Sequence, residues 1–338
     1  MKETIGIGVV GSGNMARRHL RAFKRVKGAR VLAISGRNET ALRAICSEFG
    51  VKNYYTDLES LLTRNDIDAI DVVTPTYTHE SIVTHSLLSG RHVLCEKPIA
   101  LTLAEADRML SARRSAGKIL MIGFPLRFSP EFVHAKQLIA KGVLGDIKVA
   151  WFRSARPLPV QRWYHDKDKS GGVAAELAIH FIDCLRWLIG SEAESVIGEA
   201  TGDIYGLGKE DNIWAIYRFL NGAIGVIGSS YSFNSFDDDG GIIGNKLSLR
   251  FQRSRAILSD YRKKETLFSI AARDYISGLF IPFILLKDFA IITELQHFVD
   301  CVRNNTQPEV TGEEARRTLE LVIAALQAAK TGQRVKLF

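Results

Sequence analysis

The sequence predicts an α/β protein: a doubly wound parallel sheet comes first, and an α+β domain with a large open, mainly antiparallel sheet follows. Two observations carry this prediction. Over the first third of the chain, short apolar segments alternate with helical patterns, which is typical of parallel strands joined by crossover helices. After about residue 124 this alternation gives way to consecutive strand-like segments. The length of 338 residues suits two domains, which we expect at 1–124 and 125–338.

The elements of the first domain follow from its hydrophobic pattern. Nearly continuous apolar runs, typical of buried parallel strands, predict strands at 5–10, 31–35, 69–73, 92–95 and 119–123, with a short one at 53–55. Helical spacing of apolar residues predicts helices at 14–26, 39–49, 57–63, 78–89 and 102–116.

The second domain mixes helices and strands. We expect helices at 130–141, 173–189, 288–304 and 312–330, and strands at 147–155, 194–202, 212–219, 223–231, 246–252 and 255–260. Asn221-Gly222 is a strong signal for a hairpin turn between two of these strands. The segments 156–170 and 232–244 are expected to shape a pocket or its rim. Asp237, Asp238 and Asp239 then belong to a solvated loop rather than to a metal site.

Composition and charge narrow the class of protein. With 46% hydrophobic and 24% charged residues the chain resembles soluble globular proteins, and its longest apolar run, 276–286, is too short to span a membrane. The net charge is +8, and eight basic residues lie in the acid-free stretch between Glu3 and Glu39. Such a local excess suits a small polyanion rather than a nucleic acid. A solvated basic helix face is the alternative.

The cysteines and the N-terminal sequence indicate the cellular compartment in which we expect the protein. The four cysteines are spaced neither as CxxC nor as a zinc ligand set, so we expect no metal site and no disulfide framework. The chain enters a strand directly, without the pattern of a signal peptide. Both observations favour a reducing, cytoplasmic location.

The first chemical motif is a glycine-rich turn between the first strand and the first helix. Gly11-Ser12-Gly13-Asn14-Met15-Ala16 has the form GxGxxA. The first glycine allows a tight turn, the second allows close approach of a pyrophosphate, and Ala16 allows the helix to pack closely on the strand. The helix N-terminus stabilises the anion. The motif predicts dinucleotide binding by a Rossmann domain.

The end of the second strand selects between NAD and NADP. NAD sites usually carry an acidic residue there, which binds the ribose 2′-hydroxyl. This chain instead has Ser35-Gly36-Arg37-Asn38. Ser35, Arg37 and Asn38 are therefore expected to hold a 2′-phosphate, which favours NADP(H) over NAD(H). Alternatively, Arg37 stacks on the adenine and either cofactor is used.

Glu96-Lys97-Pro98 follows the apolar segment 92–95, at the carboxyl end of a predicted strand. Open α/β sheets bind ligands at this end of their strands. A lysine there can donate to a reacting oxygen, and the proline raises the chance of a cis bond or rigid turn. An ordinary surface turn is the alternative.

Three polar residues interrupt the apolar helix predicted at 173–189. Glu176, His180 and Asp183 have the spacing i, i+4 and i+7, which places them on one helix face. Histidine is a general acid or base near neutral pH, and a carboxylate partner can orient it. The alternative is a satisfied internal hydrogen-bond network.

Taken together, these elements resemble the Gfo/Idh/MocA oxidoreductases, a family named partly after glucose–fructose oxidoreductase and inositol dehydrogenase. The matching elements are the GxGxxA turn with His19, Thr74-Pro75-Thr76 with His79, Glu96-Lys97-Pro98, Arg127 with Pro130, Gly142-Val143-Leu144-Gly145, and Gly171-Gly172 with His180 and Asp183.

The resemblance implies a Rossmann domain, a second domain whose open sheet makes oligomer contacts, and hydride transfer between NAD(P) and a sugar, polyol or related carbonyl compound. Lys97 matches the catalytic lysine and His180 the histidine that shuttles the proton. Glu176 stands where the family usually has Asp, and Tyr164 where many relatives have Arg. Further cofactor contacts are implied for Thr74, Pro75, Thr76, His79, Glu96, Lys97, Arg127 and Trp163.

The expected protein is thus an NADP(H)-favouring oxidoreductase that acts on a sugar or polyol as a homodimer or homotetramer. His180 is the expected base, Lys97 stabilises the alkoxide, and Glu176 or Asp183 orients the imidazole. Lys97 as the proton shuttle is an open alternative. An NAD-dependent glycosidase of the same fold and a non-catalytic NAD(P) or sugar sensor are alternative functions. The retention of Lys97 and His180 argues against the sensor.

Overall fold

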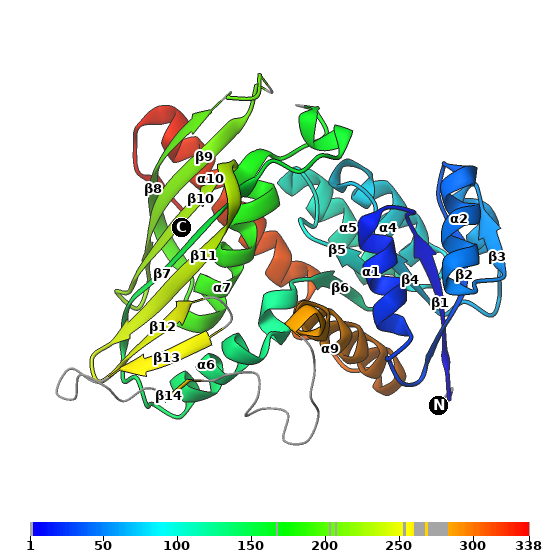
Figure 1. Ribbon diagram of the computed structural model, residues 1–338, viewed down its shortest axis with the longest axis horizontal. Helices are drawn as coiled ribbons and strands as arrows, with labels where there is room; N and C mark the ends of the chain where they lie inside the picture. Colours follow the sequence, from blue (N-terminus) through cyan, green and yellow to red (C-terminus); the bar gives the residue numbers. More distant parts are fainter. Residues whose placement is uncertain are drawn as a thin grey trace. The chain divides into compact units, whose positions relative to one another are not determined.

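A computed structural model describes residues 3–337 except 167, 203, 207, 253–254, 260–267 and 270–282 (Figure 1). The chain divides into two compact units. Residues 1–125 with 283–316 form the first, and 126–282 with 317–338 form the second. Helix α9 (Phe283–Asn304) and the start of α10 (Gly312–Thr331) therefore cluster with the first unit, although a linear division at 124 assigns them to the second domain.

The first unit contains the parallel sheet that the sequence predicts. Its strand order is β3-β2-β1-β4-β5-β6, with β1 (Ile5–Val10), β2 (Ala29–Ser35), β3 (Asn53–Tyr55), β4 (Ala69–Val72), β5 (His92–Glu96) and β6 (Leu120–Gly123). All residues of β1, β4 and β6 are buried, which explains their continuous apolar runs. The strand order reverses between β1 and β4, where doubly wound sheets bind ligands.

The helices of the first unit begin and end at residues that the sequence marks. They are α1 (Asn14–Phe23), α2 (Glu39–Phe49), α3 (Leu58–Leu62), α4 (His79–Leu88) and α5 (Leu103–Ala116). The Asn38 side chain caps α2, and Thr102 with Glu105 forms a capping box at α5. Gly117 ends α5 in the left-handed conformation, where glycine carries no steric penalty.

Helix α9 packs against α1 within the first unit. Gln296 accepts a hydrogen bond from the Lys27 amide at 2.8 Å and donates one to the Lys27 carbonyl at 3.2 Å. Arg18 lies 3.9 Å from Asp288. None of the helices in the described part of the chain is long and apolar enough to cross a membrane.

The second unit is built on a nine-stranded sheet with the order β14-β13-β12-β11-β7-β10-β9-β8-β15. Its strands are β7 (Ile147–Pro157), β8 (Ala193–Gly202), β9 (Glu210–Phe219), β10 (Ile224–Ser230), β11 (Ser232–Gly244), β12 (Ser248–Gln252), β13 (Arg255–Ser259), β14 (Phe268–Ser269) and β15 (Val335–Lys336). Its neighbouring pairs are antiparallel except β7 with β10. The predicted α/β class with a mainly antiparallel second sheet is confirmed.

An aromatic cluster joins the inner face of this sheet to helices α6 (Pro130–Ala140) and α7 (Ile179–Ile189). Phe152 on β7 is 2% exposed, and its ring lies 5.5 to 5.8 Å from those of Phe132, Phe181 and Phe251. Gly240 on β11 makes room for it, because a Cβ there would lie 2.2 Å from the Phe152 ring. The cluster therefore fixes the helices on the sheet.

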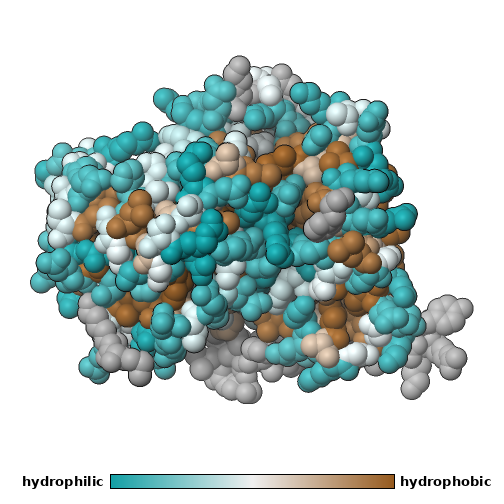
Figure 2. All heavy atoms as spheres, turned by 180° about the vertical axis from the view of Figure 1, so that it is seen from behind, coloured by the Kyte–Doolittle hydropathy of each residue, from teal (hydrophilic) through white to brown (hydrophobic). Residues whose placement is uncertain are grey.

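The opposite face of the sheet carries exposed and half-buried apolar side chains. The strand register aligns one row of them across β8, β9, β10 and β7: Ile197, Ile216, Val226 and Trp151. In the next row Trp214 is 52% exposed. Figure 2, which shows the molecule from behind, has several apolar patches within a largely hydrophilic surface. A sheet face of this kind is a candidate for contact with another protein.

Two expectations about local structure are wrong. The segment 232–244, expected as a loop, is strand β11, which pairs with both β7 and β12. Its aspartates and glycines disfavour a strand by propensity, and pairing on both sides overrides that preference. The segment 173–189, expected as one α-helix, begins as a π-helix at Ala174–Ala178 before α7 starts. Such segments often occur at functional sites.

The aromatic cluster gives a prediction about stability. We expect Phe152→Ala to lower the free energy of unfolding by about 3–5 kcal/mol, because it leaves a cavity among three rings. Urea denaturation of the full chain measures this. Phe233→Ala, on β11 and 43% exposed, is the control and should cost less than about 1 kcal/mol. Equal losses for the two variants would contradict the prediction.

Candidate active site

The turn between β1 and α1 has the geometry of a dinucleotide site. Gly11 has φ of +134°, and a Cβ there would lie 2.8 Å from the Val73 carbonyl oxygen. Gly13 precedes α1, and a Cβ there would meet no atom within 4 Å, so the space beside its Cα is open. Asn14 and Met15 begin the helix, whose first turn holds no acidic residue. The turn therefore fits a nucleotide pyrophosphate.

The residues expected to select NADP differ in what their side chains do. Buried Ser35 donates to the Asp57 carbonyl at 2.8 Å, and Asn38 accepts from the Ala41 amide at the start of α2. Arg37 donates to the Tyr77 hydroxyl at 3.2 Å in an exposed contact. Ser35 and Asn38 thus serve local structure, and Arg37 alone of the three presents an exposed cation.

Part of the basic excess in the first 38 residues is matched by acids from elsewhere in the first unit. The Arg17 guanidinium lies 2.9 Å from Glu48 on α2, and Arg18 lies near Asp288 on α9. These ion pairs support the alternative interpretation, in which part of the basic excess lies on a solvated helix face.

Lys97 lies directly after β5, at the carboxyl end of the parallel sheet. It is half-buried, and the bond between Lys97 and Pro98 is cis, as the sequence suggested. The preceding Glu96 is 6% exposed, and its side chain points to His19 rather than to the surface. This position is the one at which doubly wound sheets place residues that act on a ligand.

His19 on α1 is held between two carboxylates. Its Nδ1 lies 2.9 Å from Asp71 Oδ2, and its Nε2 lies 3.0 Å from Glu96 Oε1. Burial alone would lower the pKa of His19, but the two carboxylates outweigh burial and raise it to about 10. The imidazole is therefore charged near neutral pH and donates at both nitrogens. The same ion pair outweighs burial at Glu96 and lowers the pKa of its carboxyl.

Glu294 on α9 adds a third acid to this cluster. It is fully buried, and neither side-chain oxygen makes a well-aligned hydrogen bond to a described residue. Burial, followed by repulsion from Glu96, raises its pKa well above the ordinary range, while the nearby Phe124 amide opposes this only slightly. Burial therefore favours the neutral form of the Glu294 carboxyl. No sequence pattern pointed to this residue, because its neighbours lie about 200 residues earlier in the chain.

His79, expected to contact the cofactor, is buried and contacts main chain. Its Nδ1 lies 2.8 Å from the Pro98 carbonyl oxygen and its Nε2 lies 2.9 Å from that of Thr74. Burial lowers the pKa of His79, and the two carbonyl contacts oppose this shift only in part. Thr76 is also buried, whereas Thr74 and Pro75 are half-buried at the end of β4. His79 thus ties the end of β4 to the residue after Lys97.

Glu176 lies in the π-helical segment and His180 at the start of α7, both in the second unit. Glu176 is 4% exposed and His180 is half-buried. The glycines before the helix allow the Glu210 carboxylate to approach, since a Cβ at Gly172 would lie 2.2 Å from it. Glu210 accepts from the Ala174 amide at 3.2 Å and so caps this helix end.

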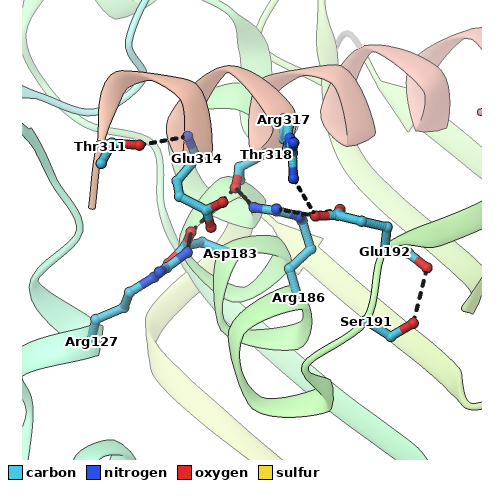
Figure 3. A network of polar contacts seen from close by, with 9 residues as sticks. All are labelled: Arg127, Asp183, Arg186, Ser191, Glu192, Thr311, Glu314, Arg317 and Thr318. Carbon is cyan, nitrogen blue, oxygen red and sulfur yellow. Dashed lines mark hydrogen bonds and ion pairs between the residues drawn. The ribbon is translucent and has the colours of Figure 1, made fainter. Parts of the chain in front are cut away.

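Asp183 does not orient His180 in this structure. We expected either Glu176 or Asp183 to orient the imidazole, and the structure corrects the expectation for Asp183. Both of its oxygens accept hydrogen bonds from Arg127, at 2.7 Å each, and Oδ1 also accepts from Thr318 (Figure 3). Arg127 is buried as well, so the pair is a desolvated, bidentate ion pair. The resemblance implied that Arg127 contacts the cofactor. We instead assign Arg127 to the ion pair with Asp183.

The polar network extends from Asp183 to the surface (Figure 3). Arg186 donates to Thr318 at 3.3 Å and makes two hydrogen bonds to Glu192. Arg317 also binds Glu192, at 2.9 Å. The network fixes α7 to the part of α10 that belongs to the second unit.

The sequence analysis missed Tyr231, which lies near Glu176. Tyr231 is 4% exposed, and burial, followed by the charge of Glu176, raises the pKa of its phenol well above the ordinary range. Tyr164 and Arg156 also act on this phenol. Trp163, the expected neighbour of the cofactor, stacks on Tyr164 with 3.9 Å between ring centroids. Tyr231 lies 55 residues after Glu176, between two strands, and no sequence pattern linked the two.

The three aspartates form ion pairs instead of a solvated loop. Arg153 on β7 binds Asp237 at 2.7 Å and Asp239 at 2.9 Å, on one face of the sheet. Asp238 points to the other face, where Arg156 binds it at 3.1 Å. The alternating pattern follows from the strand pleat.

The fold and these residues define an oxidoreductase with a nucleotide-binding first unit. The chain matches the model of the GFO_IDH_MocA oxidoreductase family with an NAD-binding Rossmann fold over residues 5–124, and that of its C-terminal alpha/beta domain over 136–337. The protein therefore belongs to the Gfo/Idh/MocA oxidoreductases, as the sequence predicts.

Several relatives match over the whole chain. Myo-inositol 2-dehydrogenase of Thermotoga maritima is 30% identical and covers 98% of both chains. Scyllo-inositol 2-dehydrogenase (NAD(+)) of Bacillus subtilis is 28% identical over 100% of this chain and 97% of its own. Levoglucosan dehydrogenase, solved with NADH and levoglucosan, shares the fold, with a TM-score of 0.91, 21% identity and 99% of each chain covered. The expected class, an NAD(P)-dependent dehydrogenase or reductase, is confirmed.

The His19 cluster predicts a specific pH dependence of stability. Because folding raises the pKa of His19 from 6.5 to about 10, its contribution is fully present below about pH 6.5 and is lost as the pH rises through 10. We expect the difference in Tm between wild type and His19→Gln to be largest near pH 6 and to shrink towards pH 10. His85→Gln, which changes an exposed histidine on α4, should show no such trend. A difference that stays constant from pH 6 to 10 would argue against a charged His19.

Proposed function

We propose that the protein transfers a hydride between a nicotinamide cofactor and a secondary alcohol or ketone of a sugar, polyol or sugar derivative. The observation that carries this proposal is Lys97 at the carboxyl end of β5, in the same parallel sheet whose strand β1 leads into the Gly11–Gly13 turn, in a chain that matches the family over nearly its whole length. The inositol dehydrogenases among its relatives support a polyol as substrate.

In the proposed mechanism, the bound nicotinamide accepts or supplies the hydride, and the protein handles the proton. His180 removes the proton from the substrate hydroxyl during oxidation and returns it during reduction. Lys97 donates a hydrogen bond to the same oxygen and stabilises the developing alkoxide. Glu176 is the favoured partner that orients His180, since the oxygens of Asp183 are bound by Arg127 and Thr318.

The proposed mechanism predicts the effect of removing either group. Lys97→Ala and His180→Ala should each lower the rate of hydride transfer by about 10²–10⁴-fold, with little change in cofactor affinity. Single-turnover absorbance at 340 nm measures this, with myo-inositol as the first polyol of a screen. Lys52→Ala and His85→Ala, both exposed, are controls.

The outcome separates the competing functions. Wild-type rates in both variants would refute the site assignment. Hydrolysis of a glycoside without net change at 340 nm would indicate a glycosidase instead, and cofactor binding with no turnover across the screen would favour a sensor.

We further propose that NADP(H) binds more tightly than NAD(H), with Arg37 as the phosphate contact. Arg37→Ala should weaken NADP binding by about 1.5–3 kcal/mol and leave NAD binding nearly unchanged. Gly36→Asp should shift the preference towards NAD, because it restores the acid and its Cβ would meet only ordinary contacts, at 3.5 Å or more. Arg30→Ala, at the opposite end of β2, is the control. Equal wild-type affinities measured by fluorescence titration would contradict this preference.

The apolar outer sheet face supports a homodimer or homotetramer through the second unit. We expect light scattering at micromolar concentration to give a multiple of the mass of one chain. Trp214→Glu should shift the protein towards the monomer, because it places a charge on this face. Leu88→Glu, on an exposed position of α4 in the first unit, should not. A wild-type monomer, or equal behaviour of the two variants, would contradict the assignment of this face.

A further inference from the structure

Lys97 lies between two residues that buried histidines hold. His19 on α1 contacts the side chain of Glu96 at 3.0 Å, on one side of Lys97. His79 on α4 contacts the carbonyl oxygen of Pro98 at 2.8 Å, on the other side. Both histidines are 1% exposed, so neither ring is open to a ligand at the surface. The two contacts come from different helices and meet at one turn.

The two contacts differ in kind. The His19 contact is ionic, because Asp71 and Glu96 lie on opposite sides of the ring. The buried carboxyl of Glu294 lies in the same cluster, and Arg18 adds positive charge near Glu96. The His79 contact is to main chain on both sides, since the ring also lies 2.9 Å from the Thr74 carbonyl oxygen. The turn is thus fixed both by a side-chain ion pair and by a backbone bridge to β4.

We propose that His19 and His79 are positioning residues that hold the Glu96-Lys97-Pro98 turn from two sides, so that the Lys97 ammonium is fixed where the reaction needs it. The catalytic part of this inference rests on the proposed role of Lys97. The resemblance implied that His79 contacts the cofactor. In this proposal His79 instead affects the reaction by holding Lys97 in place. A misplacement of about 1 Å at a reacting group costs on the order of 10²-fold in rate, which is enough to make such supports functional.

The first experiment needs neither cofactor nor substrate. Trace labelling with acetic anhydride, followed by mass spectrometry, compares the acetylation rate of half-buried Lys97 with that of exposed Lys52. Releasing the turn exposes Lys97, so His79→Phe and His19→Gln should each raise this ratio at least about threefold. His85→Phe, on the same helix as His79, should leave it unchanged. An unchanged ratio in both test variants, with the same Tm as wild type, would overturn the proposal.

The second experiment is a double-mutant cycle on hydride transfer with the polyol that the screen identifies. His79→Phe should lower kcat by about 10–100-fold in the wild-type background, with a cofactor Kd within about threefold of wild type. In the Lys97→Ala background it should lower kcat by less than about twofold, because its effect passes through Lys97. An equal loss in both backgrounds would show a general structural role and refute the proposal.

A conservative variant keeps the test decisive if His79→Phe does not fold. His79→Asn keeps an N–H donor at the place of Nδ1, which faces the Pro98 carbonyl. We expect its labelling ratio and kcat to be closer to wild type than those of His79→Gln, whose amide reaches the place of Nε2 and faces the Thr74 carbonyl. The reverse order would contradict the bridge. Absence of turnover in wild type would refute the proposed function and leave the labelling result to decide the positioning of Lys97.

Discussion

Charge buried inside a protein is stable only where opposite charge lies within hydrogen-bond distance, and this constraint organises both units. In the first unit the His19 imidazolium lies between Asp71 and Glu96. In the second the Arg127 guanidinium makes two hydrogen bonds to Asp183. Each pair joins elements that are distant in sequence. Loss of one partner leaves an uncompensated buried charge, which typically lowers the free energy of unfolding by about 3–5 kcal/mol. The elements that carry Lys97 and His180 are held by these pairs.

Sequence patterns predicted the features that depend on neighbouring residues. The GxGxxA turn, the helices and the buried strands of the first unit are local, and the structure contains them as expected. Strand β11 was missed because its aspartates are stabilised by Arg153, a residue more than 80 positions earlier. The spacing i, i+3 placed Asp183 on the same helix face as His180, but a helix position alone does not show that Arg127, from another segment, binds Asp183.

The candidate site was predictable in its residue types and less so in their tasks. Lys97, His180 and Glu176 keep the roles proposed for them, while Ser35, Asn38 and His79 bind their own chain instead of facing a ligand. Polar side chains near a motif are used for caps and turns as often as for ligands, because an unpaired buried donor or acceptor is costly. Sequence alone does not distinguish these uses.

The contribution of α9 to the first unit affects how the chain folds during synthesis. Gln296, Asp288 and Glu294 pack on or near α1, yet the ribosome makes them only after more than 280 residues have emerged. An N-terminal domain generally folds first as it leaves the ribosome. Here the surface of the nascent first unit that α9 covers stays exposed until nearly the whole second unit has been translated. The chain's topology therefore makes the nucleotide-binding unit the first to begin folding and among the last to be completed.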